Sequence, residues 1–179
     1  MSERATSKVC VDSAEPLSGE QMQPASDDWA EITQILALPV MHMPKVLLVD
    51  DDELVTERLK CTVVEAGYEV FTATSGAAAL AALKQDFMSI VVLDRSMPGM
   101  DGLALCRAIR QTHWQGYVYV MLLTAHDSEE DVVLGLNAGA DDYLSKRVSD
   151  AQLLARLRTA SRILSLEHSL KAISRNGGR

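Results

Sequence analysis

The chain has 179 residues, enough for one domain with a full core but too few for two ordinary ones. Hydrophobic residues make up 47% and charged residues 23%, a globular composition that carries no membrane signal. The net charge is −8 at pH 7, with an acidic excess over residues 1–148 and a basic excess after them, which argues against a broad nucleic-acid surface.

Residues 1–44 are predicted to be a largely disordered extension, because Ser, Glu, Gln and Pro dominate its first part and few large apolar side chains are present. Within it, Trp29, Ile32 and Leu36 recur at helical spacing and indicate a short amphipathic helix over 27–38. This helix is either a docking peptide or a loosely packed segment. Alternatively, the natural start lies at Met41 or Met43.

From Lys45 onward, short apolar runs alternate with helical patterns. The expected strands are 46–49, 68–73, 90–93, 117–123 and 142–144, and the expected helices are 53–66, 75–84, 103–111, 128–137 and a last helix capped by Ser149. Alternation of this kind predicts an α/β fold with a doubly wound parallel sheet and right-handed crossovers. We expect five helices and the flavodoxin-like strand order 2-1-3-4-5.

Polar side chains follow four of these strands. They are Asp50 and Asp51 after the first, Asp94 after the third, Thr124 after the fourth and Lys146 after the fifth. The carboxyl ends of parallel strands meet at one edge of a sheet, so these residues should converge there. Clustered carboxylates repel one another unless a cation neutralises them, and oxygen ligands select Mg²⁺ or Mn²⁺.

Asp94 has two interpretations on its own, because Asp is a common turn opener. Beside a divalent cation and Lys146, however, its carboxylate suits nucleophilic attack on a phosphoryl group, which forms an acyl phosphate. The hydroxyl of Thr124 and the ammonium of Lys146 would then contact phosphoryl oxygens and act as catalytic groups.

Four motifs stand in a fixed order along the chain: Val46-Leu-Leu-Val-Asp50-Asp51, Leu93-Asp94-x-x-Met97-Pro98-Gly-Met-Asp-Gly102, Leu123-Thr124-Ala125 and Tyr143-Leu-x-Lys146. In this order and spacing they resemble the receiver domain of two-component response regulators. The resemblance covers about residues 44–160, and we assign the domain to 45–160.

The resemblance implies that Asp94 is phosphorylated by a sensor histidine kinase or a histidine phosphotransfer protein in the cytoplasm. It makes Asp51 a direct Mg²⁺ ligand, Asp50 an acidic partner that helps to hold the ion, and the Ser96 backbone carbonyl a further ligand. The protein would act as a switch that alters protein–protein association, without being an enzyme on other substrates.

Thr124 and Tyr143 match the switch pair of this family. The resemblance implies that the Tyr143 ring moves inward as the Thr124 hydroxyl moves toward the phosphoryl group. The surface that changes is expected to comprise the fourth helix, the fifth strand and the fifth helix.

Three residues depart from the family pattern. Arg147 follows Lys146 where the family usually has proline in a cis peptide, and Arg95 stands where an apolar residue is more common. His126 follows Thr124 by two, in a position that can gate water. We therefore predict an altered lifetime of the phosphorylated state, with Arg95 and His126 as the rate-tuning residues.

The last helix carries two apolar stripes. The first is expected to dock on the sheet, and the second to lie rotated beyond the domain edge. The first comprises Leu153, Leu157, Ala160 and Leu164, and the second Ile163, Leu166, Leu170 and Ile173. Residues 161–179 would thus extend the helix, either as the seed of a homodimeric coiled coil or as a fraying end. The exit helix also resembles those that precede a diguanylate cyclase output domain, so a downstream output domain or protein is a second expected partner.

Three other functions were weighed. Haloacid-dehalogenase-type phosphatases place a second Asp two residues after the nucleophile, where this chain has Ser96, and their acidic pair follows the nucleophile. A flavin-binding module of this fold would not place acids at the phosphate loop. A degenerate receiver that acts without phosphorylation stays open as the alternative.

The cysteines Cys10, Cys61 and Cys106 are widely spaced and lie apart from the four histidines, so reduced thiols in a cytoplasm are expected. The first residues lack an apolar signal region, and the longest uncharged run near them is too short to cross a membrane.

Overall fold

The computed structural model describes residues 44–125 and 128–176, with side chains described as far as Lys171. Nearly all of the extension predicted over 1–44, including its helix at 27–38, lies outside these residues. The strands are β1 (Val46–Val49), β2 (Val70–Ala73), β3 (Ile90–Asp94), β4 (Tyr119–Thr124) and β5 (Asp142–Ser145). The helices are α2 (Glu53–Glu65), α3 (Gly76–Gln85), α4 (Gly102–Gln111), α5 (Glu129–Asn137) and α6 (Asp150–Asn176).

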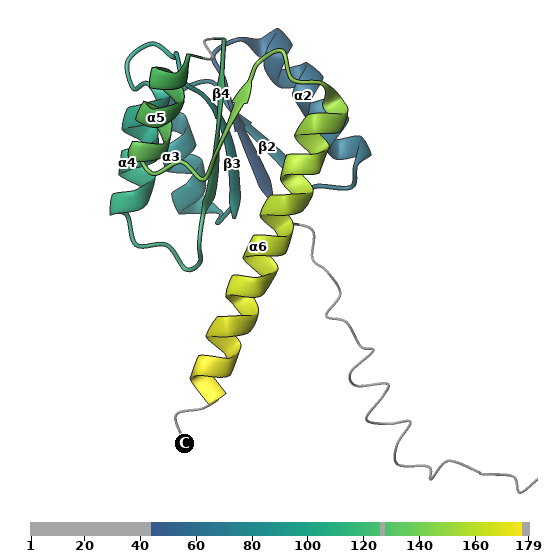
Figure 1. Ribbon diagram of the computed structural model, residues 1–179, viewed down its shortest axis with the longest axis vertical. Helices are drawn as coiled ribbons and strands as arrows, with labels where there is room; N and C mark the ends of the chain where they lie inside the picture. The colour runs from purple at the N-terminus through teal and green to yellow at the C-terminus, as the bar shows by residue number, and fades with distance from the viewer. Residues whose placement is uncertain (1–43, 126–127, 177–179) are drawn as a thin grey trace, which may run out of the picture. The chain divides into compact units, whose positions relative to one another are not determined.

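All five strands are parallel and follow the order β2-β1-β3-β4-β5, which confirms the predicted fold class. Helices α3, α4 and α5 cover one face of the sheet, and α2 and α6 cover the other (Figure 1). The central strands β1, β3 and β4 are therefore buried on both faces along their whole length, which explains their continuous apolar sequences.

Two strands start later in the structure than the sequence predicts. The strand expected from Tyr68 starts at Val70, because Gly67 adopts a positive φ of 90° and ends α2 in a Schellman turn. In that turn the Tyr68 amide donates to the Val63 carbonyl and the Gly67 amide donates to the Val64 carbonyl. The strand expected from Tyr117 likewise starts at Tyr119, where pairing with Ile90 begins.

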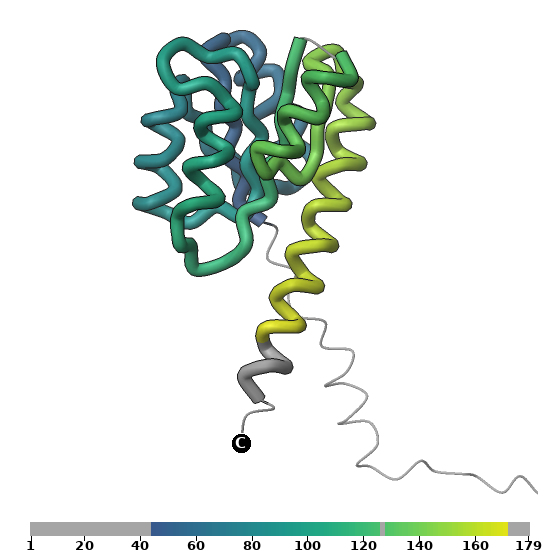
Figure 2. The backbone as a smooth tube through the Cα atoms, turned by 60° about the vertical axis from the view of Figure 1, so that its left-hand side comes forward, coloured from purple at the N-terminus to yellow at the C-terminus, as the bar shows by residue number. Residues whose placement is uncertain are grey.

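Helix α6 docks through the predicted first stripe: Leu153, Leu157 and Ala160 are fully buried, and Leu164 packs at the edge of this core. Figure 2 shows the helix continuing past the sheet. The second stripe remains exposed there, with Leu166 and Leu170 about two-thirds accessible. The side chain of Ile173 lies outside the described part of the chain.

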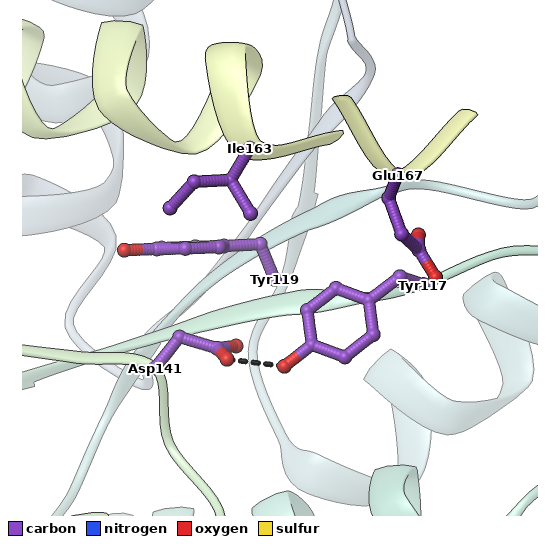
Figure 3. Close-up of a pocket in the computed structure, with 5 residues that line it drawn as sticks. All are labelled: Tyr117, Tyr119, Asp141, Ile163 and Glu167. Atoms are coloured by element: carbon purple, nitrogen blue, oxygen red, sulfur yellow. Dashed lines mark hydrogen bonds between the residues drawn. The ribbon is translucent and has the colours of Figure 1, made fainter. Parts of the chain in front are cut away.

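Asp141 joins three elements at the amino end of β4. Its carboxylate accepts hydrogen bonds from Tyr117 Oη, from Arg110 Nη2 at 2.6 Å and from the Val120 amide at 2.7 Å. Together with Tyr119 and with Ile163 and Glu167 of α6, Asp141 and Tyr117 line a hollow of about 310 Å³ (Figure 3). This end of the sheet lies opposite the carboxyl ends of the strands.

We predict that Tyr117 titrates well above the usual pKa of a tyrosine. Burial, followed by the hydrogen bond to Asp141 and its charge, raises the pKa of Tyr117 to about 12. Since this pKa lies above the usual value, the stabilisation by the neutral phenol is present below pH 10 and is lost as the pH rises toward 12. In a spectrophotometric titration of phenolate, the ionisation step at the highest pH should remain in Tyr119→Phe and be absent from Tyr117→Phe. Its persistence in Tyr117→Phe would contradict the assignment.

Candidate functional site

Three of the predicted site residues lie buried together at the carboxyl ends of the strands. Asp50, Asp94 and Thr124 follow or end β1, β3 and β4, and at most 3% of each is exposed. Lys146, just after β5, reaches into the same place, with its Nζ 2.8 Å from Asp50 Oδ2 and 3.0 Å from Asp94 Oδ2. The sheet therefore collects two carboxylates, a hydroxyl and an ammonium from four strands.

In the loop after β1, one aspartate caps helix α2 and two others belong to the site. Asp52 is the N-cap of α2, since its side chain accepts hydrogen bonds from the Leu54 and Val55 amides. The Asp52 amide in turn donates to Asp50 Oδ1 at 2.9 Å, which fixes the orientation of the Asp50 carboxylate. Asp51 lies exposed between them. The capping role of Asp52 leaves Asp50 and Asp51 available to the site.

The three aspartates form an acidic cluster. Asp50, Asp51 and Asp94 each offer a carboxylate oxygen within 4.8 Å of the others. The buried Asp50 Oδ2 contacts the Lys146 ammonium at 2.8 Å, the same ammonium that contacts Asp94. Three carboxylates this close repel one another more than one ammonium can offset, so this donor set fits a hard divalent ion.

Burial dominates the electrostatics of Asp94. Desolvation raises the pKa of Asp94, although hydrogen bonds from Lys146 and the Ser96 backbone amide oppose it. Burial lowers the pKa of Lys146, but hydrogen bonds to Asp50 and Asp94 outweigh this and raise it above its usual value. Lys146 therefore stays protonated at neutral pH, and it compensates only part of the cost of ionised Asp94.

The turn after Asp94 is tight enough to require glycine. A Cβ on Gly102 would lie 2.4 Å from the Asp94 carbonyl oxygen and 2.8 Å from Arg95 Cα. The Gly102 amide donates to the Arg95 carbonyl at 2.9 Å, and Gly99 takes a positive φ of 78°. The glycines of this motif thus bring α4 against the carboxylate-bearing end of β3.

Thr124 and Tyr143 lie on adjacent strands. The Thr124 carbonyl accepts a hydrogen bond from the Lys146 amide at 2.7 Å, which places the last residue of β4 beside the lysine. Tyr143 pairs with Leu122, and its half-buried ring packs against the core formed by α3 and α4. A Cβ on Gly135 of α5 would lie 3.0 Å from this ring, so α5 packs directly over it.

Of the two residues predicted to tune the lifetime of the phosphorylated state, the structure describes Arg95. The Arg95 backbone follows Asp94, but its guanidinium forms an ion pair with Asp131 of α5, and this pair, with a smaller contribution from Tyr143, raises the pKa of Arg95. The charge partners of Asp94 are instead Lys146 and Asp50. In this structure the Arg95 guanidinium thus pairs with Asp131, whereas the cation that contacts Asp94 is the Lys146 ammonium. His126 lies outside the described residues.

Sequence reasoning missed Asp131 as a partner of Arg95. Its sequence context, Ser128-Glu-Glu-Asp131, indicates a helix start, and the Ser128 hydroxyl does accept a hydrogen bond from the Asp131 amide. No sequence signal connects the side chain of Asp131 to Arg95. Separately, no helix in the described part of the chain is long and apolar enough to cross a membrane.

Comparison with known protein families matches residues 46–158 to the family described as "Response regulator receiver domain". The chain is 36% identical over 148 residues to the transcriptional regulatory protein AfsQ1 of Streptomyces coelicolor, which covers 75% of this chain and 64% of AfsQ1. It is 36% identical over 135 residues to the response regulator PleD of Caulobacter vibrioides, covering 75% of this chain and 30% of PleD. The chain thus spans less than two thirds of either relative.

Solved structures show the same likeness. The receiver domain of the Francisella response regulator 1452 has a TM-score of 0.62 and 33% identity, covering 66% of this chain and 97% of that one. The chemotaxis protein CheY4 of Vibrio cholerae has a TM-score of 0.63 and 32% identity, covering 66% of this chain and 98% of CheY4.

We predict that Asp94→Asn stabilises the fold when no divalent ion is present. Because the pKa of Asp94 is raised in the folded state, its contribution to stability is present at low pH and is lost as the pH rises through that pKa. At pH 7 with a chelator, the variant should gain roughly 1 kcal/mol in free energy of unfolding, measured by denaturant titration. The gain should vanish under acidic conditions, where Asp94 is protonated. A variant less stable than the native chain at pH 7 would contradict this.

Proposed function

Since the chain belongs to the response regulator receiver family, the phospho-accepting switches of two-component signalling, we propose that Asp94 is its phosphoryl acceptor. The observation that carries the proposal is the buried Asp94 carboxylate at the end of β3, within 3.0 Å of the Lys146 ammonium and beside two further aspartates. A phosphatase of the haloacid-dehalogenase type finds no support in the family match.

In the proposed reaction, an oxygen of Asp94 attacks the phosphorus atom of a phosphohistidine. The P–O bond forms, the P–N bond breaks, and the histidine of the donor leaves with its electron pair. The protonated Lys146 is positioned to hold a phosphoryl oxygen, and the hydroxyl of Thr124 supplies a second contact. Both groups stabilise negative charge as it spreads over the transferred group.

The same site is proposed to hold Mg²⁺ or Mn²⁺. Asp51, Asp50, Asp94 and the Ser96 carbonyl are the ligands we propose, supported by the acidic cluster that the three aspartates form. When bound, the ion would neutralise carboxylate charge and draw negative charge from the phosphoryl group. Thr124 and Tyr143 would then transmit the change as the switch pair.

Response regulators interact with sensor kinases and output domains. For this chain we propose a sensor histidine kinase or a histidine phosphotransfer protein as the donor. The exposed stripe of Ile163, Leu166 and Leu170 on α6 supports association with a second copy of the chain or with an output protein. The basic excess after residue 148 is too modest to favour nucleic acid.

The alternative is a degenerate receiver that acts as an interaction module without phosphorylation. Phosphorylation itself separates the two proposals. With acetyl phosphate and Mg²⁺, the native chain should gain one phosphoryl group by mass spectrometry, and Asp94→Asn should gain none. Beryllofluoride, which mimics the phosphoryl group, should shift the oligomeric state of the native chain in light scattering. An Asp94 variant that is modified as fully as the native chain would exclude Asp94 as the acceptor, and no adduct or complex would favour the degenerate receiver.

We further propose that Arg95 and His126 set the lifetime of the phosphorylated state. Arg95→Leu and His126→Ala should each change the dephosphorylation rate several-fold, because Arg95 adjoins Asp94 in the chain and His126 follows Thr124 by two. The measurement is the loss of the phosphoryl group after the donor is removed. Arg107→Leu removes an exposed cation from α4 and is the matched control. Rates equal to that control in both variants would contradict the proposal.

A further inference from the structure

Arg95 connects the phosphorylation loop to helix α5, which lies across β4. Its guanidinium forms an ion pair with the Asp131 carboxylate in the first turn of α5. The side chains of Arg95 and Asp131 are each only 20% exposed, so water screens this pair less than a surface pair. One side chain therefore joins the residue after Asp94 to α5, the helix that packs over the Tyr143 ring.

Helix α5 buries little apolar surface in its first half. Of its nine residues only Gly135 is buried, and Val133, Leu134 and Leu136 are each about half exposed. Before Gly135, Asp131 and Val132 are the helix residues that are not exposed. A helix that buries so little apolar surface gains little from packing, so a partly buried ion pair in its first turn matters more than it would on a well-packed helix.

The carboxylate of Asp131 is not needed to start the helix. The Ser128 hydroxyl caps α5 by accepting from the Asp131 amide, a bond that does not involve the Asp131 side chain. Glu129 and Glu130 also supply negative charge in the first turn, where it interacts favourably with the helix dipole. What distinguishes Asp131 from these two exposed acids is its contact with Arg95.

We propose that the Arg95–Asp131 ion pair is a latch that holds α5 in the unphosphorylated arrangement, with Arg95 as a positioning residue of the switch. The proposal rests on the proposed function, in which Asp94 accepts the phosphoryl group. That group brings about 1.5 to 2 negative charges and three acceptor oxygens to the residue beside Arg95. It thus competes with Asp131 for the guanidinium, and the latch weakens when Asp94 is phosphorylated.

Beryllofluoride binding in the presence of Mg²⁺ tests the latch. Asp131→Asn removes the ion pair, so its half-saturating beryllofluoride concentration should fall by about three- to tenfold, as expected for one charged hydrogen bond. Glu130→Gln removes an equal charge from the same turn and should leave the concentration unchanged. Asp131→Glu should restore the native value. In an Arg95→Gln background, Asp131→Asn should have no further effect. Equal affinities of Asp131→Asn and Glu130→Gln would overturn the latch.

Hydrogen exchange without any phosphoryl mimic separates failure of the latch from failure of the proposed function. The α5 amides should exchange several-fold faster in Asp131→Asn and Arg95→Gln than in Glu130→Gln. Equal exchange in all variants overturns the latch even if Asp94 is phosphorylated normally. A native chain that binds no beryllofluoride overturns the proposed function instead, and the exchange rates then decide whether the pair holds α5.

Discussion

Two carboxylates are buried side by side at the carboxyl end of this sheet, and the rest of the site follows from the cost of keeping them there. Asp50 and Asp94 are almost inaccessible to water, and a single ammonium, that of Lys146, contacts both. Desolvation outweighs that compensation at Asp94, whose pKa stays raised. A site in which negative charge remains undercompensated is prepared to bind a cation, and with it a group whose transfer needs one.

The parallel sheet imposes this arrangement by its geometry. Helices cover both faces of strands β1, β3 and β4, so these strands carry apolar side chains until they end, and the charged and hydroxyl groups of the site stand at or just after their last residues. All strands end at the same edge, which brings distant parts of the sequence together. The close approach of α4 at Gly102 then encloses the end of β3. Stability and chemistry are thus divided between the interior of the strands and their ends.

The two helices nearest the fifth strand are attached very differently. Helix α6 buries Leu153, Leu157 and Ala160 completely, which anchors it to the body of the domain. Helix α5 buries only Gly135 and is joined through Asp131 to the residue that follows Asp94. Elements with little apolar burial open at low cost, so α5 is suited to respond to charge at the site, whereas α6 is suited to carry a rigid surface.

The sequence by itself determined the fold class, the strand order and the residues that meet at the sheet edge. These depend on hydrophobic periodicity and on motifs at the strand ends, which are local signals, and the strand order was confirmed. Strand starts at Tyr68 and Tyr117 were wrong because helix-end geometry and pairing partners decide them. Only the tertiary structure decided where Arg95 points, because the partner of a long side chain depends on packing between α5 and β5, and sequence spacing does not encode that.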